Sequence, residues 1–62
     1  MNMKKTIKML IEVQESKHYS DTMMAALLNV HHATYMRWKK SRTIPKNFAH
    51  ISNIIKFLEE NK

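Results

Sequence analysis

The apolar residues of this chain recur at the three- and four-residue spacing of amphipathic helices. Over residues 3–17 most Lys and Glu residues lie away from one face of the helical wheel. That face consists of Met3, Ile7, Leu10, Ile11 and Gln14. The segment therefore predicts a first helix over residues 3–17.

Polar residues mark where the next helix is expected to begin and end. Ser20 is a good N-cap, and Asp21 places a negative charge in the first turn, where it favours the helix dipole. These two residues predict a second helix over residues 21–28. Asn29 is the expected break after it, because Asn tolerates the left-handed conformation that turns a chain sharply.

Two further helices are expected after this break. A third is predicted over residues 31–40, followed by a loop over 41–45, because Pro45 disfavours helical geometry in the residue before it. A fourth is predicted over residues 46–60, since the first turn of a helix accepts Pro. Its expected buried face consists of Phe48, Ile51, Ile55 and Leu58, with Ile54 beside them. The pattern predicts an all-α fold, a small four-helix domain.

Length and composition favour one domain over residues 1–62. The chain has no Gly, one Pro and no Cys, so neither a linker nor a disulfide nor a Cys-based zinc site is indicated. A chain of this size buries only about 60% of the surface that its unfolded form exposes. Small domains without such bonds often gain stability by oligomerisation, and a homodimer is expected here.

Positive charge is concentrated in one segment of the chain. Eleven Lys and Arg residues against five Asp and Glu give a net charge of +6, which favours a polyanionic partner such as nucleic acid. Residues 32–50 hold five of these cations and no acid, and residues 22–58 hold no carboxylate at all. Because no pair of carboxylates lies at usable spacing, we expect no enzyme, no cofactor and no small-molecule substrate.

Neither a targeting signal nor a metal site is expected. The opening MNMKKTIKMLIEV is basic, but Lys8 and Glu12 interrupt its apolar run, so we expect a cytoplasmic protein without membrane contact. His31 and His32 are adjacent, and neighbouring residues on a helix diverge by about 100°. No His or Cys lies four residues from either, which argues against metal ligation.

The expected third helix has two chemically different faces. At about 100° per residue, Tyr35 and Trp38 fall on one side, while Ala33 and Arg37 fall on the other. We expect the aromatic side to be buried and the basic side to face outward. Two short helices joined by a tight turn, the second basic on its outer face, describe a helix-turn-helix whose second helix can enter a DNA major groove.

Residues 21–40 resemble the helix-turn-helix of lambda-repressor-like and Cro-like regulators. The second half of that motif commonly reads LGVSRATVSRW, and residues 28–38 read LNVHHATYMRW. The motif's six buried positions correspond to Met24, Ala25, Leu28, Val30, Tyr35 and Trp38, all apolar or aromatic. A helix before the motif, and SRTIPKNF leading into a helix after it, also match the family's layout, so the resemblance covers nearly the whole chain.

Several residues depart from the family pattern. Asn29 replaces the usual turn Gly, and His31 replaces the usual Ser or Thr cap of the second helix, which weakens that cap. Tyr35 is larger than the usual Val or Ile. The fifth helix of many relatives is missing, so the family's dimer interface does not carry over.

The resemblance and the helical wheel together imply a set of DNA contacts. Arg37 is the strongest candidate, because its guanidinium group can bind guanine O6 and N7 bidentately. The expected base-contacting residues are His31, His32, Ala33, Met36 and Arg37. Phosphate contacts set register and affinity rather than sequence. The expected phosphate-contacting residues are Ser20, Thr22, Lys40, Ser41, Arg42, Thr43, Lys46 and Asn47.

These features favour a Cro-like transcriptional regulator, a repressor from a phage, plasmid or bacterial mobile element. The resemblance implies a homodimer on a palindromic double-stranded DNA operator, with helix 31–40 of each copy in successive major grooves about 34 Å apart. Two alternatives stay open, since fold does not fix function. One is a helix-turn-helix module that binds a protein, as an antitoxin or anti-repressor does, and the other is an excisionase-like protein that bends DNA.

Overall fold

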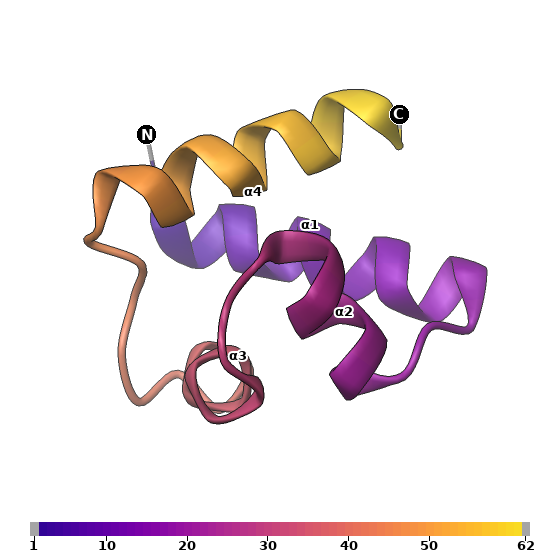
Figure 1. Cartoon of the computed structure of the whole chain (residues 1–62), viewed down its shortest axis with the longest axis horizontal. Helices are drawn as coiled ribbons and strands as arrows, with labels where there is room; N and C mark the ends of the chain where they lie inside the picture. Colours follow the sequence, from indigo (N-terminus) through magenta and orange to yellow (C-terminus); the bar gives the residue numbers. More distant parts are fainter. Residues whose placement is uncertain (1, 62) are drawn as a thin grey trace.

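Four α-helices make up the structure, a computed structural model that describes residues 2–61 (Figure 1). They are α1 (Met3–Lys17), α2 (Asp21–Leu28), α3 (His32–Lys39) and α4 (Phe48–Glu60). No strand is formed within residues 2–61, so the predicted all-α four-helix architecture is confirmed. The first and last residues of the domain expected over 1–62 lie outside the described residues.

Three of the helices begin at a side chain that caps them. The carbonyl oxygen of the Asn2 side chain accepts from the Lys5 N–H at 3.2 Å, and the Ser20 hydroxyl accepts from the Met23 N–H at 3.0 Å. These bonds satisfy backbone donors that have no partner inside the helix. α1 and α2 therefore have the predicted bounds.

α1 and α2 end at a left-handed residue that is not glycine, and another such residue follows the Lys40 cap of α3. His18, Asn29 and Ser41 have φ values of 58°, 57° and 58°. After each of them, the next N–H donates to a carbonyl five residues back, as from Val30 to Ala25 at 2.9 Å, which satisfies free carbonyls at the helix end. The break predicted at Asn29 is confirmed, as is the end of the third helix before Ser41, although the left-handed conformation of Ser41 was not predicted.

The bounds of α3 and α4 differ slightly from the prediction. His31 and Lys40 flank α3 as its caps rather than belonging to it. α4 begins at Phe48, not at Lys46. The reason is Asn47, whose backbone is extended and whose side-chain oxygen accepts from the Ala49 N–H at 2.8 Å, so that Asn47 acts as the N-cap.

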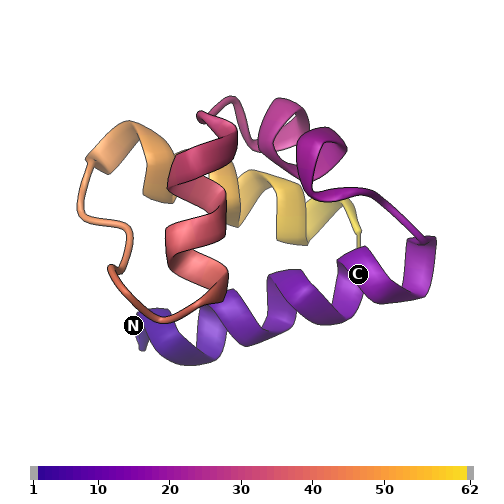
Figure 2. The ribbon, with the colours of Figure 1, turned by 90° about the horizontal axis from the view of Figure 1, so that it is seen from below.

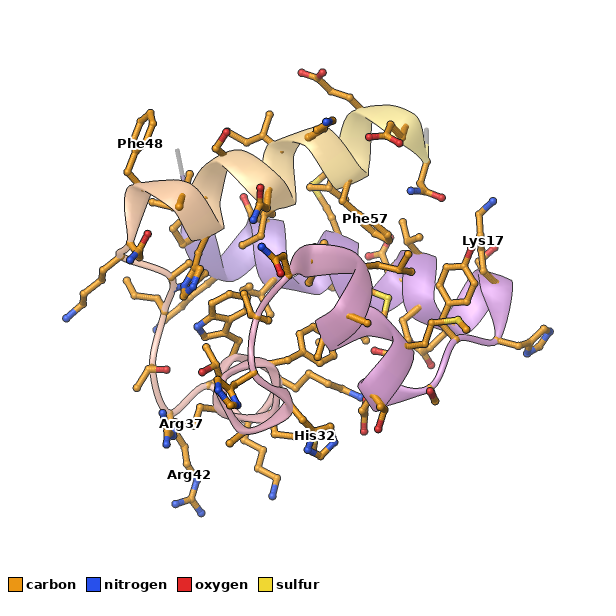
Figure 3. The ribbon with its side chains drawn as sticks, viewed as in Figure 1. Lys17, His32, Arg37, Arg42, Phe48 and Phe57 are labelled. Carbon is orange, nitrogen blue, oxygen red and sulfur yellow. The ribbon has the colours of Figure 1, made fainter. Side chains whose placement is uncertain are left out.

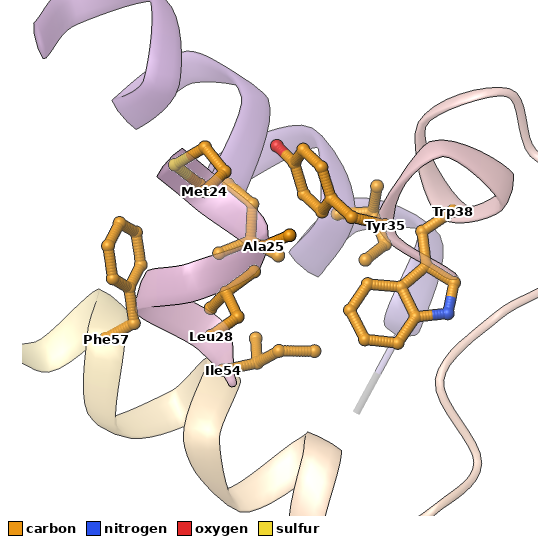
Figure 4. Close-up of a cluster of buried hydrophobic side chains, with 9 residues drawn as sticks. Met24, Ala25, Leu28, Tyr35, Trp38, Ile54 and Phe57 are labelled. Carbon is orange, nitrogen blue, oxygen red and sulfur yellow. The ribbon is translucent and has the colours of Figure 1, made fainter. Parts of the chain in front are cut away.

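One apolar core joins all four helices (Figure 4). Its fully buried members come from every helix and are Ile7, Leu10, Met24, Ala25, Leu28, Tyr35, Trp38, Ile54 and Phe57. Five of the six positions predicted to be buried in the helix-turn-helix are in this core. The sixth, Val30, is half-buried against it.

The buried face of α4 was predicted incorrectly. Ile54 and Phe57 face the core, whereas Phe48 is 84% exposed and Ile51, Ile55 and Leu58 are half-buried. At about 100° per residue, Phe48 lies about 120° around the helix from Ile54, too far to reach the same core. Leu58 packs against the edge of the core, while Phe48, Ile51 and Ile55 form a second apolar stripe of α4 outside it.

The helices are arranged so that α3 occupies one side of the molecule. α1 and α4 lie on the opposite side, and α3 is seen end-on at the lower edge in Figure 1. Viewed from below, α3 crosses in front of α4 (Figure 2). The Asn53 side chain of α4 donates to the Leu28 carbonyl at 3.2 Å, which attaches the end of α2 to α4.

We predict that His18→Gly stabilises the domain by about 0.5–1 kcal/mol, because glycine adopts positive φ without a Cβ clash. Urea unfolding followed by circular dichroism measures the change. Lys8→Gly is the matched control, since Lys8 is exposed inside α1, where glycine should destabilise the domain by about 0.5–1 kcal/mol. A His18→Gly protein less stable than the wild type would contradict the prediction.

Candidate nucleic-acid interface

The outer side of α3 is exposed while its aromatic side is buried. Tyr35 and Trp38 are 0% and 3% exposed, which confirms that both rings face inward. His32, Ala33 and Arg37 on the opposite side are exposed. Figure 3 shows His32, Arg37 and Arg42 at the lower edge of the molecule, away from Phe48 at the top. The basic side of α3 is therefore free of the protein's own chain.

A buried amide fixes the position of α3 against α1. The Tyr35 hydroxyl donates to the side-chain oxygen of Gln14 at 2.6 Å. The Gln14 amide nitrogen donates to the Tyr19 carbonyl at 3.1 Å and to the Asp21 carboxylate at 2.7 Å. Gln14 thus bonds α1 to the loop after it, to the start of α2 and to α3.

Asp21 and Lys39 form an ion pair beside this amide. The Lys39 ammonium lies 2.7 Å from the Asp21 carboxylate and 5.9 Å from the centre of the Tyr35 ring. Hydrogen bonds from Gln14 and then Lys39 hold the pKa of Asp21 below its ordinary value. Lys39 is therefore neutralised by α2, so four of the five cations counted in residues 32–50 remain for an external anion.

Trp38 packs α3 against α4. Its ring meets the Tyr35 ring edge-on, with centroids 6.5 Å apart, and the His50 ring at 5.8 Å. Edge-to-face contacts of this kind add to the energy of burial. With Tyr35 held by α1 and Trp38 by α4, the rotation of α3 about its own axis is set on both sides.

The residues predicted to contact bases lie on one surface, with one difference in exposure. His31, His32, Ala33 and Arg37 are exposed, whereas Met36 is half-buried. His31 precedes the helix and forms no side-chain cap hydrogen bond, as expected for a residue in place of Ser or Thr.

All eight residues predicted to contact phosphate are exposed. They are Ser20, Thr22, Lys40, Ser41, Arg42, Thr43, Lys46 and Asn47. Two of them also have structural roles, since the oxygens of Ser20 and Asn47 cap α2 and α4. Each keeps a donor, a hydroxyl hydrogen or an amide NH₂, that a phosphate oxygen can accept from.

The structure adds Lys4 to this surface. Lys4 lines a small hollow together with Trp38, Ser41, Thr43 and Ile44, so the start of α1 lies beside the loop that follows α3. The sequence pattern placed Lys4 only on the polar side of a helix. No local signal relates it to residues nearly forty positions away.

No protein-family model, curated protein or solved structure matches the chain. Among residues 2–61, no group of three or more His, Cys, Asp or Glu side chains is placed to hold a metal ion. None of the helices in that range has the length and apolar character needed to cross a membrane. The geometry of α3 and the charges around it are therefore the features from which we infer what this chain binds.

Burial and the nearby Asp21 charge raise the pKa of Tyr35 to about 12. The chain has two tyrosines, so in a Tyr19→Phe protein the tyrosinate absorbance reports Tyr35 alone, with a midpoint we predict at about 12. The unfolded chain ionises first, at a pH of about 10. Stability linked to Tyr35 is therefore full below pH 10 and lost as pH rises towards 12.

Urea unfolding across this pH range measures that loss, and Tyr35→Phe is the control. Its stability should fall less between pH 10 and 12, because the buried phenol of Tyr35 is no longer present to ionise. A Tyr35 midpoint of about 10 in the folded protein would contradict the buried hydroxyl.

Proposed function

We propose that this protein binds double-stranded DNA in a sequence-specific manner, with α3 in the major groove, and acts as a transcriptional regulator of the repressor type. One observation carries the proposal. The outer side of α3 and the loop after it form an exposed cationic surface without an acidic residue, while the opposite rings of the same helix are buried. A helix of this kind fits the width of the major groove.

The charges of this surface account for affinity. Its cations are Lys4, Arg37, Lys40, Arg42 and Lys46, all exposed. Each phosphate that a cation neutralises releases counterions, which makes binding strong at low salt and weaker as salt rises. The nearest acid, Asp21, is paired with Lys39 and does not oppose this attraction.

The side chains of α3 account for sequence preference. Arg37 offers a fork of donors for a guanine, worth about 1–3 kcal/mol of discrimination. Ala33 beside it has only a methyl group, so the helix backbone can approach the bases closely. His32 can donate to or accept from a base edge, and Met36 can pack on a thymine methyl group.

Repression would follow from occupying a site that overlaps a promoter. The homodimer on a palindromic operator stays a prediction, as does the cytoplasmic location. A protein-binding module and a DNA-bending protein are the alternatives. The first requires binding to a protein target that persists at high salt, and the second requires cooperative coating of adjacent DNA sites.

Selection of bound duplexes from a random pool tests the proposal. A preferred sequence of a few base pairs is expected, and the symmetry of that sequence together with the mass of the complex reports the number of copies bound. Recovery of unenriched DNA at moderate salt would contradict sequence-specific binding.

We predict that Arg37→Ala relaxes preference for one base pair by about 1–3 kcal/mol, because the bidentate contact is lost. Repeating the selection with the variant measures this. Lys5→Ala is the matched control, since it removes one exposed charge of α1 that is not part of the cationic surface. If the Arg37→Ala protein ranked DNA sequences as the wild type does, Arg37 would not be a base-contacting residue.

A second variant separates phosphate contacts from base contacts. Arg42→Ala is expected to weaken binding to all duplexes alike and to reduce the slope of log affinity against log salt by about 1, since one phosphate contact is lost. Fluorescence anisotropy over a salt series measures the slope. Lys5→Ala should leave the slope unchanged, and equal slopes in all three proteins would argue against a phosphate contact at Arg42.

A further inference from the structure

The side of the molecule opposite α3 carries an apolar surface formed by α1 and α4. A groove of about 550 Å³ lies between these helices. A second hollow on α4, lined by Phe48 and Ile51, adjoins the groove. We call this surface the α1–α4 face, and its apolar residues are Met9, Val13, Phe48, Ile51, Ile55 and Leu58. Phe48 is 84% exposed and Met9 is 44% exposed.

The spacing of these residues is that of a buried helix face. Phe48, Ile51 and Ile55 recur at i, i+3 and i+7 along α4, which is typical of a stripe packed against another element. The core of the domain instead uses Ile54 and Phe57. The stripe is therefore patterned for burial, but the single domain leaves Phe48 exposed and Ile51 and Ile55 only half-buried.

The charges around the α1–α4 face indicate what can cover it. Glu12, Lys17 and Glu59 line the groove, and Lys56 lines the adjoining hollow, so the two acids and two cations balance. The cationic surface around α3 repels another copy of this chain, whose net charge is +6. The α1–α4 face carries no net charge and does not repel a second copy. Because acids and cations both border the same apolar patch, it can meet a copy of itself.

We propose that a second copy of this chain binds across the α1–α4 face in a twofold symmetric contact. Such a contact uses the same patch on both copies. The Phe48 side chain of each copy is then buried against the apolar surface of its partner. A domain of this size buries only about 60% of the surface that its unfolded chain exposes, and this contact adds to the buried area.

This contact determines where the two α3 helices point. Phe48 lies at the edge of the molecule opposite Arg37 and Arg42 (Figure 3). A twofold axis in the plane of the contact therefore turns the two cationic surfaces away from each other. Given the proposed DNA binding, on which this step rests, the dimer joins two separate duplex segments rather than placing both helices in successive grooves of one duplex.

Sedimentation equilibrium of the full chain, from micromolar to millimolar concentration, tests the contact without DNA. The wild type should approach twice its 7.4 kDa mass. Phe48→Ser and Met9→Ser should each raise the dissociation constant at least about tenfold, because each substitution acts twice in a symmetric dimer. Leu27→Ser is the matched control, as Leu27 is 49% exposed on α2, and it should leave the dissociation constant unchanged.

Thermal unfolding shows whether each variant is folded, and the exposure of Phe48 and Met9 predicts that both are. A wild type that stays monomeric throughout, or a folded Phe48→Ser protein that dimerises as well as the wild type, would overturn the proposal. Either result would mean that a second copy of the chain does not cover the α1–α4 face.

Capture of a labelled duplex by a second, immobilised duplex tests the joining of DNA segments. The wild type should capture it, whereas Phe48→Ser should bind each duplex singly and capture none. Dimers that bind no duplex would contradict the proposed function alone. Two copies on one palindromic duplex, with no capture of another, would overturn the joined arrangement.

Discussion

The hydrogen bond between the Tyr35 hydroxyl and Gln14 is the contact on which the arrangement of this domain depends. A buried hydroxyl without a partner costs about 1–3 kcal/mol, so Tyr35 is tolerated in the core only where an acceptor reaches it. Gln14 supplies that acceptor, and its amide nitrogen is used by Tyr19 and Asp21. The same bonds that satisfy these groups fix α3 relative to α1 and α2, and thereby decide which side of α3 faces outward.

Local signals predicted the fold well where a polar side chain marks a boundary. Ser20 and Asn29 act within one turn of the chain, so the bounds of α2 follow from sequence. The buried face of α4 did not, because α4 carries two adjacent apolar stripes and a helical wheel cannot tell which one the rest of the chain covers. Packing against α2 selected Ile54 and left Phe48 exposed.

The candidate site, too, has features that the sequence predicted and features that it did not. The outward side of α3 could be predicted because its residues share one helix, where spacing alone determines direction. The contribution of Lys4, the pairing of Lys39 with Asp21 and the hydrogen bond from Tyr35 to Gln14 could not be predicted, since each joins residues far apart in sequence. The sequence thus indicates which side of α3 faces outward. Tertiary contacts determine how many cations of that side stay unpaired and how rigidly α3 is fixed to the rest of the domain.

The fluorescence of Trp38 reports on the position of α3 within the domain. It is the single tryptophan of the chain, and its indole is buried at the junction of α3 and α4, beside the ring of His50. Its fluorescence therefore arises from the contact between the cationic helix and α4. A displacement of α3 from α4 admits water to the indole and moves the emission to longer wavelength, so repositioning of this helix can be followed without a label.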